Sequence, residues 1–317
     1  MAQSTASFFT DPTDVQTALG EHCQVGFVVT GRGPFRARLI RITLTRLSLL
    51  SAEEWQSRVL FVRPPADRVI VLLPWGCEPS QRWAGIPLRP QEVLTIRSVP
   101  GVHGRTVDHC HSAAVVCSTD YLVRLGRRLV GPTFVVPPGV ARWQPAPDAL
   151  RALVGLFRAA IRVTASRLSA PTSPEAARGL EQEMVGALAE CLSIAPEEPH
   201  RQREQSQISL MARFAEILCL HSERLPSSAD LSRQLGVPAR TLRGYCHDHL
   251  GVAPGRYLQL YQLQQFRRGL RGADPGVTTV SALARRHGIR QTSRLARSYR
   301  DLFGEPPSAT LRHTAES

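Results

Sequence analysis

Lysine is absent from this chain of 317 residues, so all 39 of its Lys or Arg positions are arginine. Long apolar runs are also absent, because the longest, such as residues 69–74, fall far short of the roughly 18–20 residues that a membrane span requires. The first residues, 1–5, contain neither the basic nor the apolar segment of a signal peptide. These absences predict a soluble protein of the cytoplasm that does not associate with a membrane.

Paired cysteines and catalytic motifs are missing as well. The seven cysteines are an odd number and include no C-x-x-C pair, which argues against a disulfide framework or a zinc ribbon. The sequence has no G-x-S-x-G elbow, no P-loop and no G-x-G-x-x-G after a strand. We therefore expect no enzymatic activity, no catalytic residue, no metal ion and no cofactor.

The positive charge is concentrated at one end of the chain. The use of arginine in place of lysine is typical of a GC-rich genome and is not by itself evidence of function. The distribution of the arginines along the chain is more informative. Residues 224–317 contain 15 arginines and 6 acidic residues, a net charge of +9, whereas residues 1–223 contain 24 arginines and 20 acidic residues, a net charge of +4. A basic C-terminal third beside a nearly neutral remainder indicates a polyanionic partner, most often nucleic acid.

The length and the hydrophobic pattern predict two domains, because 317 residues exceed the roughly 100–200 of a typical single domain. Residues 1–142 contain short apolar or alternating runs separated by proline and glycine, which is typical of a β-sandwich or barrel. The adjacent apolar residues Leu39 and Ile40 break the alternation of one run and predict a bulge or a change of buried face. The runs lie at 35–45, 59–62, 69–73, 93–96, 113–117 and 134–136.

From about residue 143 the apolar spacing becomes helical. Apolar residues recur at helical spacing over 150–161 and again over 180–191, and the polar, proline-marked segment 195–207 is typical of a linker. We therefore interpret residues 143–200 as a helical extension and linker. The apolar faces of its helices have two alternative partners, the β-rich domain and a second copy of the chain, and the sequence leaves both open.

An internal repeat in the basic third is the strongest signal in the sequence. The segment 231–237 corresponds to 283–289 at an offset of 52 residues, and beyond the glycines Gly236 and Gly288 the offset becomes 53. Each copy contains a helix, a glycine turn and a second helix that ends at glycine and proline, which is the pattern of a helix-turn-helix motif. Gly236 and Gly288 are expected to adopt the positive φ that the tight turn requires.

The second helix of each copy, at about 239–250 and 291–303, is expected to enter the major groove of DNA. Arginines lie near the start of both helices, where they can donate two hydrogen bonds to guanine or bind phosphate. A helix over 254–271 is expected to join the two copies. The alternative is an all-helical packing domain whose charges are simply solvated, which two copies in register make a poor explanation.

Residues 208–312 resemble the DNA-binding domain of the AraC/XylS family of bacterial transcription regulators. The matching runs are Leu235-Gly236-Val237, Arg240-Thr241-Leu242, Leu250-Gly251-Val252-Ala253-Pro254, Tyr257-Leu258, Ala284 with Gly288, Ser298 to Glu305, and Pro307-Ser308. The ending is similar to that of the branch that includes the ethanolamine-utilisation regulator, and so is the short run Gly33-Pro34-Phe35-Arg36-Ala37.

The resemblance implies an α+β protein, with an N-terminal β-rich cupin-like barrel plus helices and a C-terminal all-α domain, residues 206–312, in which a linker helix joins two helix-turn-helix motifs. The N-terminal domain would sense a ligand or dimerise. Implied partners are double-stranded DNA, RNA polymerase, a small-molecule effector and a second copy of the chain, with activation commoner than repression.

The predicted DNA-binding residues combine the family's base-facing positions with the arginines near each helix start. They are Arg240, Thr241, Arg243, Arg290, Gln291, Ser293, Arg294 and Arg297. Gly244 also falls at a base-facing position, and because it has no side chain the first helix is expected to read fewer bases. Gln262 replaces the family's usual arginine in the linker helix, which is expected to weaken an ion pair that braces the two halves.

The rival interpretation is a cupin-like small-molecule-binding or metal-dependent enzyme with an accessory DNA-binding domain. Its candidate ligands are His109 and His111, since alternate residues of a strand face the same side. A cupin metal site also needs a carboxylate soon after the histidine pair, and residues 112–119 contain none. We therefore interpret the two histidines as polar surface. Other candidates without a motif are His103, Glu78 and Asp108.

Overall fold

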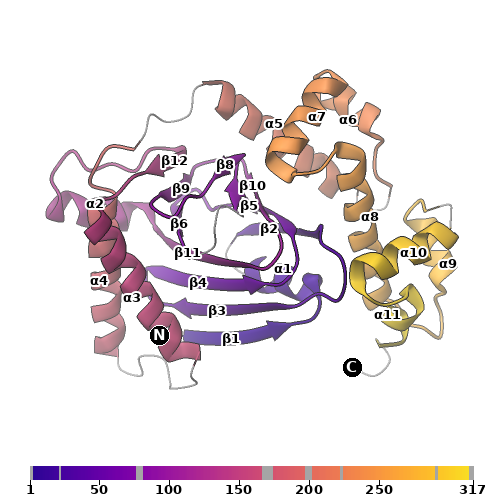
Figure 1. Cartoon of the computed structure of the whole chain (residues 1–317), viewed down its shortest axis with the longest axis horizontal. Helices are drawn as coiled ribbons and strands as arrows, with labels where there is room; N and C mark the ends of the chain where they lie inside the picture. The colour runs from indigo at the N-terminus through magenta and orange to yellow at the C-terminus, as the bar shows by residue number, and fades with distance from the viewer. Residues whose placement is uncertain are drawn as a thin grey trace.

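The protein is an α+β molecule in which strands come first and helices dominate the second half (Figure 1). The computed structural model describes residues 3–20, 23–75, 81–165, 174–196, 202–221, 224–289 and 292–313. The described strands are β1 (Gln3–Phe9), β2 (Gln24–Val29), β3 (Ala37–Thr43), β4 (Leu47–Glu54), β5 (Arg58–Arg63), β6 (Arg68–Leu73), β7 (Arg82–Trp83), β8 (Ile86–Pro87), β9 (Val93–Arg97), β10 (Val102–Thr106), β11 (Cys110–Ser118) and β12 (Gly139–Trp143). The described helices are α1 (Pro12–Gly20), α2 (Thr119–Leu129), α3 (Pro147–Ala165), α4 (Pro174–Cys191), α5 (Gln202–Leu220), α6 (Ser228–Leu235), α7 (Ala239–Leu250), α8 (Pro254–Arg271), α9 (Val280–Arg286), α10 (Thr292–Phe303) and α11 (Pro307–His313).

The strands form two sheets that face each other. The larger sheet has seven strands in the order β1-β3-β4-β11-β6-β9-β12, and the smaller has five in the order β2-β5-β10-β7-β8, with every pair antiparallel. Between them lies a mostly apolar cavity of about 90 Å³. A buried ion pair lines this cavity, in which Nε of Arg58 donates to both carboxylate oxygens of Glu54 at 3.0 and 2.9 Å. The β-rich prediction is therefore confirmed as a two-sheet, barrel-like arrangement.

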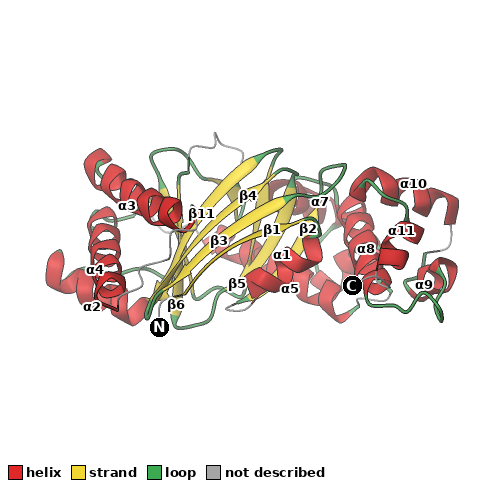
Figure 2. Cartoon of the chain, turned by 90° about the horizontal axis from the view of Figure 1, so that it is seen from below, coloured by secondary structure: helices red, strands yellow, loops and turns green. Residues whose placement is uncertain are grey.

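Helices cover both outer faces of this pair of sheets, as Figure 2 shows. Helices α2, α3 and α4 lie against the larger sheet, where Leu49, Phe157 and Leu188 belong to one buried cluster. The apolar faces predicted at 150–161 and 180–191 therefore pack on the β-rich domain, which decides between the two partners that the sequence left open. Because α3 and α4 share a core with the sheet, the helical extension is structurally part of the N-terminal domain.

Several local predictions were wrong. Residues 134–136 form no strand, and the last strand is instead β12, whose Trp143 donates to Oγ1 of Thr95 at 2.9 Å, so the predicted boundary at 142/143 falls inside a strand. Leu39 and Ile40 form no bulge, because β3 pairs in continuous register with both neighbours and is buried on both faces. The predicted linker at 195–207 is shorter, since α5 begins at residue 202. The prediction contained neither β1 nor the helices α1 and α2.

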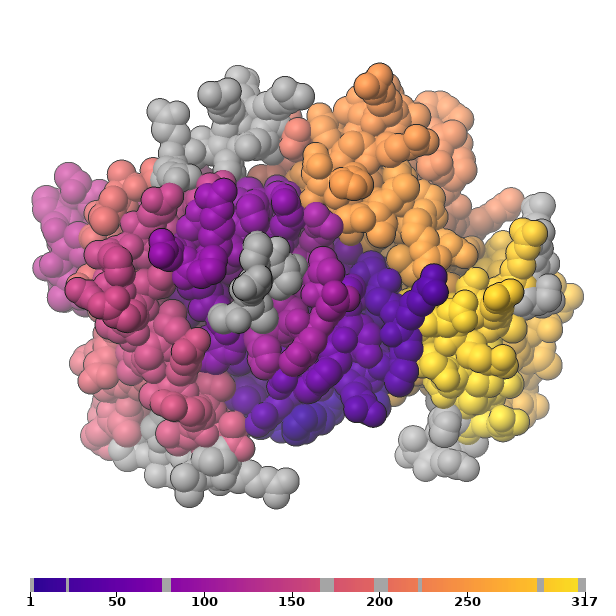
Figure 3. Space-filling view, in the orientation of Figure 1, coloured from indigo at the N-terminus to yellow at the C-terminus, as the bar shows by residue number. Residues whose placement is uncertain are grey.

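The C-terminal helices pack against the smaller sheet and share its core. One buried cluster continues from strand residues such as Phe27 and Val59 to Phe214, Leu242 and Tyr299 in the helices. Figure 3 shows the helices α6–α11 as one side of the molecule, in direct contact with the β-rich part. None of the helices in the described ranges is long and apolar enough to cross a membrane.

Two buried histidines lie where α7 meets β10. His103 is fully buried, and neither of its ring nitrogens has a hydrogen-bond partner among the described residues. Burial and the charge of His249 lower the pKa of His103 to about 3. Burial also lowers the pKa of His249 to about 4, although the nearby Asp248 acts in the opposite direction. Both rings are therefore neutral near pH 7, and charging either one opposes this packing.

We expect the free energy of unfolding to fall as the pH decreases from about 6.5 towards 4.5. In this range the unfolded chain binds protons on His103 and His249 that the folded protein does not bind, which costs about 1.4 kcal/mol per pH unit for each histidine. His103→Leu should remove its share of this slope. Denaturant titrations over pH 4.5–8, a range chosen to stay above the usual carboxyl pKa of about 4, measure the effect. The control is His221→Leu at an exposed histidine, and equal slopes in the two variants would contradict the assignment.

Candidate nucleic-acid interface

The first helix-turn-helix unit consists of α6 and α7. Ser227 and Asp230 form a capping box that begins α6, with each side chain accepting a hydrogen bond from the other residue's backbone N–H. Gly236 ends the helix with φ of 69°, and its N–H donates to the carbonyl of Arg233 at 3.2 Å. The N–H of Val237 donates to the carbonyl of Ser232 at 3.1 Å. These contacts fix the turn from which α7 starts.

The second unit, α9 and α10, repeats this construction. The side chain of Thr279 caps α9 by accepting from the N–H of Ala282, and Gly288 has φ of 70°. The N–H groups of Gly288 and Ile289 donate to the carbonyls of Arg285 and Ala284 at 3.0 and 2.9 Å, which are the same two bonds as in the first turn, 52 residues later. The repeat and the positive φ of both glycines are confirmed. Its aligned apolar positions are buried in both copies: Leu242 with Leu295, Cys246 with Tyr299, and Leu250 with Phe303.

Helix α8 joins the two units over the residues that the sequence predicts. Its 18 residues correspond to a length of about 27 Å, of the same order as the roughly 34 Å between successive major grooves on one face of DNA. Nε2 of Gln262 donates to the carbonyl of His287 at 2.8 Å, so this glutamine braces α8 against the end of α9 by a hydrogen bond. Phe266 is fully buried with its ring edge against Tyr299.

The predicted contact residues of α7 lie on its exposed surface near its start. Arg240, Arg243 and Gly244 are exposed and Thr241 is half-buried, whereas the end of the helix is buried against the β-rich domain. Pro238 precedes the helix and no side chain caps it, so its first N–H groups are open to an acceptor such as a phosphate.

In α10 the structure describes part of the predicted set. Arg294 and Arg297 are exposed on one side of the helix, opposite the buried Leu295 and Tyr299. Thr292 and Ser293 belong to the helix backbone, and their side chains are not described. Arg290 and Gln291 lie outside the described residues. The structure therefore places four of the predicted arginines, Arg240, Arg243, Arg294 and Arg297, on exposed surfaces of the two second helices.

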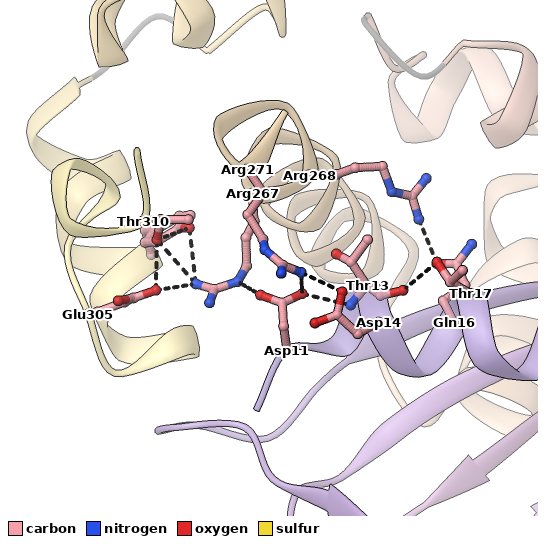
Figure 4. Close-up of polar contacts among 11 residues, drawn as sticks. Asp11, Thr13, Asp14, Gln16, Thr17, Arg267, Arg268, Arg271, Glu305 and Thr310 are labelled. Atoms are coloured by element: carbon pink, nitrogen blue, oxygen red, sulfur yellow. Dashed lines mark hydrogen bonds and ion pairs between the residues drawn. The ribbon is translucent and has the colours of Figure 1, made fainter. Parts of the chain in front are cut away.

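A polar network that no sequence motif predicts ties α8 to both the N-terminal domain and the second unit (Figure 4). Nε of Arg267 donates to Oδ2 of Asp11 at 2.6 Å, and its Nη1 lies 2.8 Å from Oε1 of Glu305. The same Nη1 donates to Oγ1 of Thr310 at 3.3 Å and to the hydroxyl of Tyr299 at 3.1 Å. The buried Arg267 of α8 thus contacts the N-terminal domain through Asp11 and the C-terminal helices through Tyr299 and Thr310.

The charges in this network stabilise one another. Burial alone would raise the pKa of Asp11, but the charge of Arg267 and the hydrogen bonds from Arg267 and the backbone of Thr13 outweigh it and hold that pKa below its usual value. Arg271 adds a second ion pair, with Nη1 at 3.0 Å from Oδ1 of Asp11 and 2.8 Å from Oδ1 of Asp14. The stabilisation that Asp11 provides is therefore complete above pH 4 and is lost as the pH falls through its lowered pKa.

Further hydrogen bonds join the domains. The N–H of Gly33 donates to the carbonyl of Asp301 at the end of α10 at 3.1 Å, and the N–H of Val29 donates to Oε1 of Gln264 at 3.1 Å. Gln16 accepts from Nη2 of Arg268 at 2.7 Å. Beside the network lies a cleft of about 660 Å³, bounded by both domains and lined by residues that include Asp14, Arg36, Arg271, Phe303 and Glu305.

The rival metal ligands are only partly brought together. His109 and His111 lie on one side of the larger sheet beside Glu53 of β4, a carboxylate that the sequence analysis missed because it lies 56 residues before His109. His103 is separate, in the contact between β10 and α7, and Asp108 occupies the turn before β11 with φ of 55°. Glu78 lies outside the described residues.

Asp11→Asn should reduce the free energy of unfolding by about 3 kcal/mol, because it leaves the buried Arg267 with one carboxylate fewer while an amide oxygen can still cap α1. Asp14→Asn is the matched control: its side chain is 46% exposed, and we expect a loss below about 1 kcal/mol. Denaturant-induced unfolding at pH 7 measures both values. Equal small losses would show that the buried pair does not hold the domains together.

Comparisons with known proteins agree with this geometry in the C-terminal part. Residues 231–313 match the family model described as "Helix-turn-helix domain". The chain is 32% identical over 133 residues to the "Probable thc operon regulatory protein" of Rhodococcus erythropolis, covering 39% of this chain and 40% of that protein. It is 33% identical over 87 residues to the "HTH-type transcriptional activator RhaS" of Pectobacterium atrosepticum, covering 27% and 30%.

Among solved structures, the AraC-like transcriptional activator CuxR aligns over 89% of this chain and 99% of its own, with 14% identity and a TM-score of 0.41. The matched segments span between 30% and 40% of the length of the two sequence relatives. What these relatives share with the chain is thus confined to less than half of it. Together with the geometry, the family match identifies residues 231–313 as a helix-turn-helix domain.

Proposed function

We propose that this chain is a sequence-specific DNA-binding transcription regulator of the AraC/XylS type, which places α7 and α10 in successive major grooves. The observation that carries the proposal is the pair of helix-turn-helix units, built by the same hydrogen bonds and each exposing arginines on its second helix. The net charge of +9 over residues 224–317 favours attraction to the phosphate backbone. No catalytic step is part of this function.

We propose that the chain activates transcription, by acting on RNA polymerase, rather than repressing it. Relatives that match this chain carry the names of activators, RhaS and the XylDLEGF operon transcriptional activators of Pseudomonas putida. Within the family, the run Ser298 to Glu305 supports a place near the ethanolamine-utilisation branch as a finer hypothesis. A second copy of the chain is a further proposed partner, since two copies would double the number of DNA elements that are read.

For the N-terminal domain we propose a role in presenting the two units to DNA. Asp11 contacts Arg267 of α8, and Gly33 contacts Asp301 of α10. Strand β10 contacts α7, so one domain contacts both second helices and the helix between them. An effector that altered this domain would change the relative position of α7 and α10. The interior cavity of about 90 Å³ is small for such a ligand, and the interdomain cleft of about 660 Å³ offers more room.

Selection of bound sequences from random duplex DNA with the whole chain, at fixed salt, tests the proposed function. We expect an enriched motif with two elements about 10 bp apart, one for each second helix. Binding without an enriched motif would mean that the arginines contribute mainly phosphate contacts. The absence of DNA binding would overturn the proposal.

Substitution of the exposed arginines should show which element of the DNA motif each second helix reads. Arg294→Ala and Arg297→Ala should each cost about 1–3 kcal/mol of binding free energy for the selected site and relax one element. Arg240→Ala and Arg243→Ala should relax the other. Titrations against the selected duplex and a scrambled duplex measure the difference, with Arg178→Ala, an exposed arginine of α4, as the control of equal charge. An equal loss on both duplexes would indicate contact with phosphate alone.

A further inference from the structure

We propose that Glu53, His109 and His111 form a binding site for one divalent transition-metal ion, of the class that prefers nitrogen and oxygen ligands, such as Zn²⁺. The site lies on the outer face of the larger sheet, on the same side as Leu49 and Val115, and the proposal does not rest on the proposed function. It is built by strand pairing: His111 on β11 lies directly opposite Glu53 on β4, and His109 precedes it by two residues and faces the same side.

The distances fit a metal ion. Oε1 of Glu53 lies 3.1 Å from Nε2 of His109 and 3.4 Å from Nε2 of His111, and one donor atom from each of the three residues lies within 4.8 Å of the others. Metal–ligand bonds of about 2.0–2.2 Å in a tetrahedral arrangement separate neighbouring donors by about 3.3 Å. A small displacement of the two rings would therefore complete three bonds to one ion.

The surroundings hold the ligands in place. The ring of Trp55 stacks on His109, with centroids 5.3 Å apart and an interplanar angle of 13°, which restricts the rotation of this imidazole. The N–H of Asp108 donates to Oγ of Ser57 at 2.8 Å and anchors the turn before β11. Arg38, which pairs with Glu53 across β3 and β4, packs its guanidinium over the ring of Phe8 at 5.2 Å from the centroid.

The ligand set and its exposure indicate the kind of site. Two imidazoles and one carboxylate are the donors that Zn²⁺, Ni²⁺ and Fe²⁺ accept, whereas Mg²⁺ and Ca²⁺ prefer oxygen alone. The side chains of His109, His111 and Glu53 are 49%, 35% and 23% exposed, so solvent reaches the remaining coordination positions. The proposed site is therefore an open, exchangeable one with three protein ligands and water.

Titration of the whole, metal-free chain with Zn²⁺ in a calorimeter, and with Co²⁺ by visible absorption, tests the proposal. We expect one Zn²⁺ per chain, and Co²⁺ bands of nitrogen and oxygen coordination without the near-ultraviolet band that thiolate ligands produce. Glu53→Gln should weaken binding about tenfold or more, and His109→Asn and His111→Asn should do the same. Thermal unfolding of each variant checks that these changes at the surface leave the fold intact.

His221→Asn and Glu175→Gln are the matched controls, an exposed histidine directly after α5 and an exposed carboxylate on α4, and both should bind Zn²⁺ like the parent protein. Failure to bind Zn²⁺ or Co²⁺ would overturn the proposal and leave the cluster as a carboxylate that pairs with the imidazoles of His109 and His111. Binding that Glu53→Gln leaves unchanged, or that shows thiolate bands, would also overturn it.

Discussion

A single buried arginine, Arg267, imposes the constraint on which the arrangement of this molecule depends. A guanidinium removed from water is stable only if its charge and its hydrogen bonds are satisfied. Asp11 and Glu305 supply the charges, while Tyr299 and Thr310 supply further acceptors. These groups come from the N-terminal domain, from α10 and from the segment that follows it, so satisfying one side chain brings these parts together around α8.

An apolar core shared with the smaller sheet also joins the first helix-turn-helix unit, α6 and α7, to the N-terminal domain. Strand residues of the smaller sheet and buried residues of α5, α7 and α8 belong to one cluster, and the neutral pair His103 and His249 lies inside the contact between β10 and α7. Apolar packing thus joins both α7 and α10 to one domain, and α10 is held by polar bonds as well.

The secondary structure of the C-terminal third could be predicted from the sequence more closely than that of the N-terminal part. In the C-terminal third, apolar spacing and two glycines defined α6–α10 closely, because a helix and a tight turn depend on residues a few positions apart. In the N-terminal part, the run at 134–136 and the pair Leu39 and Ile40 were misinterpreted. A strand buried on both faces, as β3 is, loses the alternation from which its faces are predicted.

The helix-turn-helix repeat, the positive charge of the C-terminal third and the arginines near the start of α7 and α10 could all be predicted from the residues alone. Contacts between distant residues became visible only in the folded molecule: Asp11 with Arg267, 256 residues apart, and Glu53 with His109, 56 residues apart. The first group follows from local hydrogen bonds and periodicity, which a few neighbouring residues specify. The second follows from strand register and from the need to satisfy buried charge, which depend on the fold of the whole chain.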